Sequence, residues 1–126
     1  MIKSHFEIQF AEIQREAHRI NVANGWWDDR RRLMTSGVPG AQANVILACL
    51  ALVTSEVAEA MEAVRKHDPD TWADAKTKDT LVRELAGAVV RCMDLAGELD
   101  IPLAEAIRAE IDANAARGFR HGGKAA

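Results

Sequence analysis

The chain has 126 residues, of which 48% are apolar and 28% charged, and its formal net charge is −3. This profile is that of one soluble globular domain with a real core, and it gives no general attraction to nucleic acid polymers or to anionic membranes. The longest strongly apolar run, residues 45–53, is too short to cross a bilayer, and the N-terminus lacks the pattern of a signal peptide, so we expect a cytoplasmic protein.

Helical periodicity recurs along most of the chain, and no alternation typical of strands is sustained. We therefore predict an all-α fold, a four-helix bundle that forms a single domain over residues 1–126. Asn44 is the expected cap of the second helix, and Pro102 is expected to open the fourth. The predicted segments in chain order are a helix at 3–23, a long loop at 24–43, helices at 44–67, 79–99 and 102–117, and a basic tail at 118–126.

Carboxylates stand where apolar residues would be expected in the second helix. Glu56 falls inside its apolar stripe, and Glu59 lies on the border of that stripe, three residues further on the same face. If the second and third helices pack antiparallel, Glu84 converges on the same point. Such a cluster needs compensation, and Mg²⁺, which prefers a few hard oxygen ligands, would supply it. The alternative reading is a solvated edge, with Arg65, Arg83 or Arg91 as ion-pair partners of the glutamates. Glu62 is expected to be surface.

Several short motifs resemble those of MazG-like, all-α nucleoside triphosphate pyrophosphohydrolases. SEVAE at residues 55–59 is similar to the EExxE element of that family, and ELAG at 84–87 falls where the family carries ExxD. GWWD at 25–28, RCMDLAGEL at 91–99 and RHGGK at 120–124 resemble one subgroup, in which a GWW element precedes the helices and RHGGK closes the chain. The resemblance covers nearly the whole chain.

This resemblance implies Mg²⁺-dependent hydrolysis of a (deoxy)nucleoside triphosphate to the monophosphate and pyrophosphate, for dNTP pool control or sanitation, with Mn²⁺ as an alternative ion. By position, Glu56, Glu59 and Glu84 would be the metal ligands and catalytic carboxylates, and one of them would orient the attacking water. The family assembles as homodimers or homotetramers, so we expect a homo-oligomer.

Two positions depart from the family pattern. Ser55 stands where EExxE has its first glutamate, and Gly87 stands where ExxD has a metal-binding aspartate. Asp94 is no simple substitute, because seven residues along a helix correspond to roughly 10 Å of rise. The departure at Gly87 keeps a second function open, that of a nucleotide-binding helical oligomer with impaired catalysis. A third is the related phosphoribosyl-ATP pyrophosphohydrolase, which the GWWD loop fits poorly.

Further residues are candidates for binding the nucleotide. Trp26 and Trp27 offer surfaces on which a base could stack, although one of them could instead plug the core. Asp94 could read a sugar or base edge, but we favour a local ion pair between Asp94 and Arg91, one helical turn apart. The basic tail could fold over bound phosphates, as a lid does. The remaining candidates are Asn21 and His18 for the base pocket, and Asn114, Arg117, Arg120 and Lys124 for the phosphates.

Overall fold

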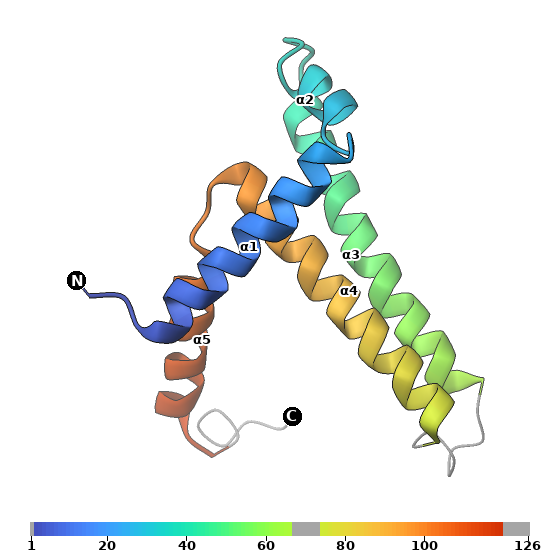
Figure 1. Cartoon of the computed structure of the whole chain (residues 1–126), viewed down its shortest axis with the longest axis vertical. Coiled ribbons are helices and arrows are strands. Elements are labelled where there is room, and N and C mark those ends of the chain that lie inside the picture. The colour runs from blue at the N-terminus through green and yellow to red at the C-terminus, as the bar shows by residue number, and fades with distance from the viewer. Residues whose placement is uncertain (1, 67–73, 120–126) are drawn as a thin grey trace.

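The computed structural model describes residues 2–66 and 74–119, and these form five α-helices and no strand (Figure 1). The predicted all-α fold class is therefore confirmed for the described residues. One helix more than predicted is present, in the segment expected to be a loop. The helices in chain order are α1 (His5–Ala23), α2 (Asp28–Met34), α3 (Ala41–Arg65), α4 (Ala75–Leu99) and α5 (Leu103–Arg117).

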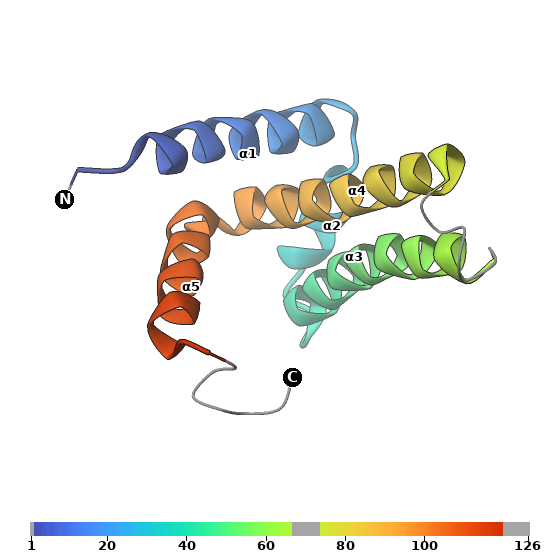
Figure 2. The same cartoon turned by 90° about the horizontal axis from the view of Figure 1, so that it is seen from below.

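Helix α1 begins at a capping box and lies across the C-terminal half of α4 (Figures 1 and 2). The Ser4 hydroxyl accepts a hydrogen bond from the Glu7 backbone amide, and the Glu7 carboxylate accepts one from the Ser4 amide. This reciprocal arrangement satisfies two donors that would otherwise lack partners at the helix start. The predicted first helix is thus present, with its beginning fixed by Ser4.

The segment predicted as a continuous loop at 24–43 contains the short helix α2, so that prediction was wrong. Asp28 and Asp29 stand in the first turn of α2, and Arg31 and Arg32 stand in its last turn. Acidic residues at the start of a helix and basic residues at its end both interact favourably with the helix dipole. Charge placement therefore stabilises a helix that apolar periodicity did not indicate.

Helices α3 and α4 run side by side in opposite directions and form the longest element of the molecule (Figures 1 and 2). The antiparallel packing predicted for them is confirmed. Helix α3 starts three residues before the predicted cap, Asn44, because Gly40, at a φ of 79°, turns the chain into the helix. Helix α4 starts at the cap Asp74, whose carboxylate accepts a hydrogen bond from the Thr77 amide.

The buried core lies where α2 meets the neighbouring ends of α3 and α4, and it is built around Trp27, Val45, Cys49 and Leu95. Away from this junction the α3–α4 hairpin is thinly covered. By length and composition alone, α3 could cross a membrane, and only 17% of its most apolar stretch is buried in the single chain. The nine-residue apolar run did not indicate a possible membrane span, because it covers only the most apolar part of α3.

Candidate functional site

Three carboxylates converge between α3 and α4, as the sequence spacing predicts. Glu56 and Glu59 come from α3 and Glu84 from α4, and each offers an oxygen within 4.8 Å of the other two. The antiparallel packing is what brings α4 alongside the row of glutamates on α3. Oxygens this close could all be ligands of one small divalent cation.

The close approach of these groups perturbs their protonation. The Glu84 and Glu56 side chains are hydrogen-bonded, and this bond, together with desolvation and the neighbouring Glu59, raises the pKa of Glu84 to about 7. The pKa of Glu56 is lowered, because its carboxylate accepts hydrogen bonds from Glu84 and from Arg91. Without a cation, Glu84 therefore keeps its proton to a higher pH than an ordinary glutamate, while the ionised form of Glu56 is favoured.

Because Gly87 has no side chain, the Glu56 carboxylate occupies the space beside it. A Cβ atom built on Gly87 would lie 2.9 Å from Glu56 Oε2 and 3.1 Å from the carboxyl carbon. Any larger residue at this position would push the Glu56 side chain elsewhere. The position at which the chain departs from the ExxD pattern is therefore in contact with the cluster, and Glu56 lies against the backbone of α4 there.

Arg91 pairs across the hairpin with Glu56, and not with Asp94 as we expected. Its Nε lies 2.7 Å from Glu56 Oε1. The local pairing failed because three donors from other segments already surround Asp94. The alternative reading of the glutamates had named Arg91 as one of three possible ion-pair partners, and the structure shows this pairing for Glu56.

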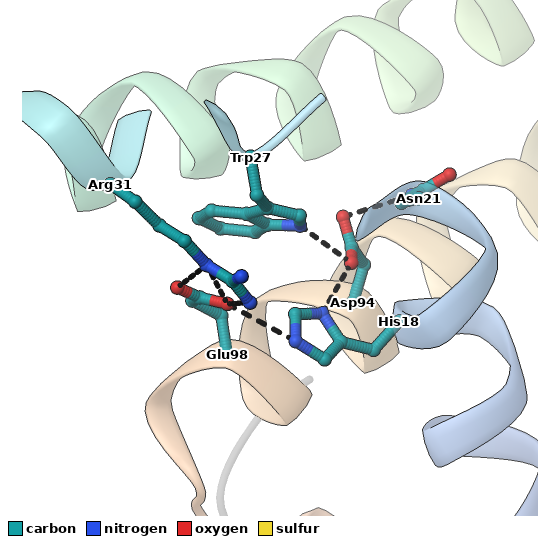
Figure 3. A network of polar contacts seen from close by, with 6 residues as sticks. All are labelled: His18, Asn21, Trp27, Arg31, Asp94 and Glu98. Atoms are coloured by element: carbon teal, nitrogen blue, oxygen red, sulfur yellow. Dashed lines mark hydrogen bonds and ion pairs between the residues drawn. The ribbon is translucent and has the colours of Figure 1, made fainter. Parts of the chain in front are cut away.

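Asp94 is the centre of a buried polar network (Figure 3). Its side chain accepts hydrogen bonds from Asn21 Nδ2 and Trp27 Nε1, each at 2.9 Å, and His18 Nδ1 lies 2.9 Å from the same carboxylate. Asp94 is only 6% exposed, so these donors compensate for its desolvation. Asn21 and His18, predicted to lie near the base, are thus held by α4.

Glu98 extends this network and was not identified as a site residue from the sequence. Arg31 donates to both Glu98 oxygens at distances of 2.7–3.2 Å, and His18 Nε2 lies 3.1 Å from Glu98 Oε1 (Figure 3). His18 thus stands between two carboxylates, one near each ring nitrogen. The one signal in the sequence was the position of Glu98 on the polar face of α4, one turn beyond Asp94.

A cleft of about 450 Å³ joins the carboxylate cluster to the segment that follows α1. Glu56, Gly87 and Arg91 line one part of it, and Asn21 and Trp26 line another. Arg30, Leu52, Val90 and Asp94 complete the wall. The cleft therefore brings Glu56, one of the predicted metal ligands, into one space with Asn21 and Trp26, which were predicted to lie near the base.

The two tryptophans occupy different environments. Trp26 is 64% exposed and lines the cleft, whereas Trp27 is 1% exposed and belongs to the core. Arg30 lies over the Trp27 ring, 4.8 Å from the ring centroid. A base could stack on Trp26, but the buried Trp27 ring is not accessible to a ligand, so the prediction that Trp27 contacts the nucleotide is corrected.

The predicted phosphate-binding residues near the C-terminus are not brought to the cleft by the described part of the chain. Asn114 and Arg117 are exposed on α5 and contact each other, with Arg117 Nη1 donating to Asn114 Oδ1 at 3.3 Å. Helix α5 contacts α1 and turns away from the hairpin (Figure 1). Arg120 and Lys124 lie outside the described residues.

No family model, curated protein or solved structure matches the chain. Functional assignment therefore rests on the motifs in the sequence and on the geometry of this cleft.

Proposed function

We propose that the chain is a Mg²⁺-dependent, MazG-like pyrophosphohydrolase that converts a (deoxy)nucleoside triphosphate to the monophosphate and pyrophosphate. The observation that carries the proposal is the continuity of one cleft. A single space is lined by Glu56 of the carboxylate cluster, by two arginines suited to phosphates, Arg30 and Arg91, and by an exposed aromatic ring, Trp26. A nucleotide needs a site with all three of these environments.

The donor set fits a small hard cation. The oxygens of Glu56, Glu59 and Glu84 lie within 4.8 Å of one another, and the Glu84 side chain is hydrogen-bonded to Glu56. Mg²⁺ binds to a few carboxylates and completes its shell with water and substrate phosphate. When bound, such an ion neutralises phosphate charge and lowers the pKa of a coordinated water.

The side chains of the cleft have distinct roles in this proposal. Trp26 stacks on the base, and Asn21, whose amide is oriented by its bond to Asp94, hydrogen-bonds to the base edge. Arg30 and Arg91 bind phosphate oxygens. A carboxylate of the cluster accepts a proton from the attacking water, the α–β phosphoanhydride bond breaks, and pyrophosphate leaves. His18 holds the end of α1 by its contacts with Asp94 and Glu98.

The basic tail has a part in the same proposal. Arg117, Arg120 and Lys124 would bind the outer phosphates, and Asn114 would orient Arg117, to which it is hydrogen-bonded. Because α5 turns away from the cleft, this role requires the tail to reach it after the nucleotide binds or from another subunit. The charge of these side chains and the glycines between Arg120 and Lys124 support such a closure.

The test incubates the protein with each of the four dNTPs and four NTPs, with Mg²⁺ or Mn²⁺, and follows pyrophosphate and monophosphate. We expect metal-dependent release of both products with at least one nucleotide. Glu59→Ala should abolish the release. Glu62→Ala is the matched control, because Glu62 lies three residues further on α3 and pairs with Arg65 and Lys66 at the surface. Release of orthophosphate alone, or no metal-dependent product with any nucleotide, would rule the proposal out.

A second candidate is a nucleotide-binding helical oligomer with impaired catalysis. The observation in its favour is that Glu56 pairs with Arg91 and lies over Gly87, where the family motif has a metal-binding aspartate. Gly87→Asp separates the two candidates. A large gain over a near-zero rate supports impaired catalysis, whereas a competent native site predicts little change or a loss, because the new side chain displaces Glu56.

We also propose that the chain acts as a homodimer or homotetramer in the cytoplasm and binds neither membranes nor nucleic acid polymers. The support for the oligomer is the apolar surface that the hairpin leaves exposed in a single chain. Leu47, Leu50, Val57, Met61 and Val64 on α3 are all more than one-third exposed, as are Val82, Leu85 and Val89 on α4. Apolar patches on this scale usually mark an interface.

A further inference from the structure

Arg91 and Glu56 form a partly buried ion pair at the edge of the carboxylate cluster. The Glu56 side chain is 17% exposed and the Arg91 side chain 41%, and the Nε–Oε1 distance of 2.7 Å is that of a strong charge-assisted hydrogen bond. Arg91 lies one helical turn after Gly87, on the same side of α4. The missing Cβ at Gly87 is what lets Glu56 lean against α4 and reach this arginine.

Glu56 consequently has two competing partners. One is the guanidinium of Arg91, and the other is a cation held with Glu59 and Glu84, whose oxygens lie within 4.8 Å of its own. Both partners are positive, and two positive groups on one carboxylate repel each other strongly in a partly desolvated site. Binding of a divalent ion by Glu56 therefore weakens its bond to Arg91, and the reverse holds by linkage.

Arg91 would not leave the site when this bond breaks. It lines the same cleft as Arg30 and Trp26, and its side chain is exposed enough to turn toward a ligand there. A planar guanidinium binds phosphate oxygens well. The cleft thus offers the arginine a second anionic partner, which enters together with the metal.

We propose that Arg91 is an exchangeable counter-ion, which neutralises Glu56 in the metal-free protein and moves to the triphosphate when a divalent cation takes its place. The inference rests on the metal site of the proposed function and adds its regulation. Metal and nucleotide then bind cooperatively. The cation displaces Arg91 from Glu56, and the triphosphate gives Arg91 a new anionic partner.

Metal binding without nucleotide gives the first test. Mn²⁺ affinity is measured by titration calorimetry or by electron paramagnetic resonance for the wild type and for Arg91→Gln. We expect roughly three- to tenfold tighter Mn²⁺ binding by Arg91→Gln, the range that one partly exposed ion pair can contribute. The same variant should melt at a lower temperature than the wild type in EDTA, because Glu56 loses its partner.

Two further variants separate this role from general charge effects and from misfolding. Arg83→Gln removes the same charge from the same helix, at an exposed arginine that pairs with Asp79, and should leave Mn²⁺ affinity within about twofold of the wild type. Arg91→Lys keeps a positive charge near Glu56 and should restore weaker, wild-type-like Mn²⁺ binding. Equal affinities for Arg91→Gln and Arg83→Gln, or weaker binding by Arg91→Gln, would overturn the proposal.

Binding of an α,β-methylene triphosphate at saturating Mn²⁺ tests the second half. Arg91→Gln should bind this analogue about tenfold more weakly, the loss of one charge-assisted phosphate contact. Unchanged analogue affinity would show that the released arginine does not move to the phosphates. Because neither titration requires turnover, the proposed hydrolysis can fail while this exchange holds. If neither the wild type nor Arg91→Gln binds Mn²⁺, both proposals are wrong.

Discussion

Among individual side chains, Glu84 has the clearest consequence for pH dependence. Its pKa in the folded chain is about 7, above its ordinary value of 4.5, because it donates to Glu56 and lies close to Glu59. A carboxyl with a raised pKa favours the folded state while it is protonated, so its contribution is complete below pH 4.5 and is lost as the pH rises through 7. The pKa of Glu56 is lowered, so its ionised form stabilises the folded state, and this contribution is lost only as the pH falls below its ordinary value of 4.5.

We therefore predict that the metal-free protein loses stability as the pH rises from 4.5 to about 7. Thermal melting in EDTA across this range measures the effect, and Glu84→Gln, which cannot ionise, should have a flatter profile than the wild type. With saturating Mg²⁺ the trend should reverse, because the ion binds the ionised cluster. Parallel profiles for Glu84→Gln and the wild type in EDTA would contradict the raised pKa of Glu84.

Side chains of the cluster differ in how far the sequence could predict them. Glu56, Glu59 and Glu84 were predictable as a group, because helical spacing and one antiparallel contact are enough to bring them together. Arg91 was one of three arginines that the sequence offered as partners of the glutamates, but its choice of Glu56 depends on a gap at Gly87 that only the packed helices reveal. A local partner was the natural choice for Arg91, and tertiary contacts to Asp94 excluded it.

Two glycines within α4 meet their neighbours in different ways. At Gly97, an added Cβ would lie 2.7 Å from the Cβ of His18, an atom fixed by the backbone of α1. At Gly87, the nearest atoms are the carboxylate end of Glu56, which can rotate. Gly97 thus sets how closely α1 approaches α4, while Gly87 affects only one flexible side chain.

We predict that the same substitution, glycine to alanine, changes the stability of the protein differently at these two positions of α4. Gly97→Ala should destabilise the protein by about 1–3 kcal/mol, the cost of overpacking, although alanine favours the helix by up to about 1 kcal/mol. Gly87→Ala should remain within about 1 kcal/mol of the wild type, because its helix preference offsets the displaced carboxylate. Urea unfolding at fixed protein concentration measures both, and equal losses for the two variants would contradict this account of the α1–α4 contact.

The helices themselves followed from the sequence to different degrees. Regular apolar spacing indicated α1, α3, α4 and α5, with boundaries within a few residues of those observed. Helix α2 escaped because its seven residues, DDRRRLM, are held by end charges and by the burial of the preceding Trp27 rather than by an apolar face of their own. Burial of one of two adjacent tryptophans is likewise decided by packing that no local pattern contains.

The five helices together leave much of the hairpin surface uncovered. Val57 and Met61 on α3 line an apolar groove with Leu81 and Leu85 on α4, and the first two are 42% and 55% exposed. We predict that Met61→Asp lowers the oligomeric state, because a buried charge at an interface is costly without a partner. Size-exclusion chromatography with light scattering measures it, against a protomer mass of 13.8 kDa.

The control for this prediction is Ala109→Asp, which introduces the same charge at an exposed position of α5. It should elute like the wild type, as a dimer or tetramer. A monomeric wild type at micromolar concentration would contradict the oligomer. The same mass for the wild type and Met61→Asp would exclude this groove as the contact.

Asp94 determines which segments of the chain should unfold locally together. Its carboxylate joins the end of α1, through His18 and Asn21, to the start of α2, through Trp27, although these segments lie 67–76 residues away along the sequence. Local opening usually occurs in cooperative units. The backbone amides near residues 18–28 should therefore exchange with solvent deuterium as one unit, at a common rate governed by that carboxylate, while the first turns of α1 exchange earlier. The wall of the cleft that Asn21 and Trp26 form should then open as a single unit.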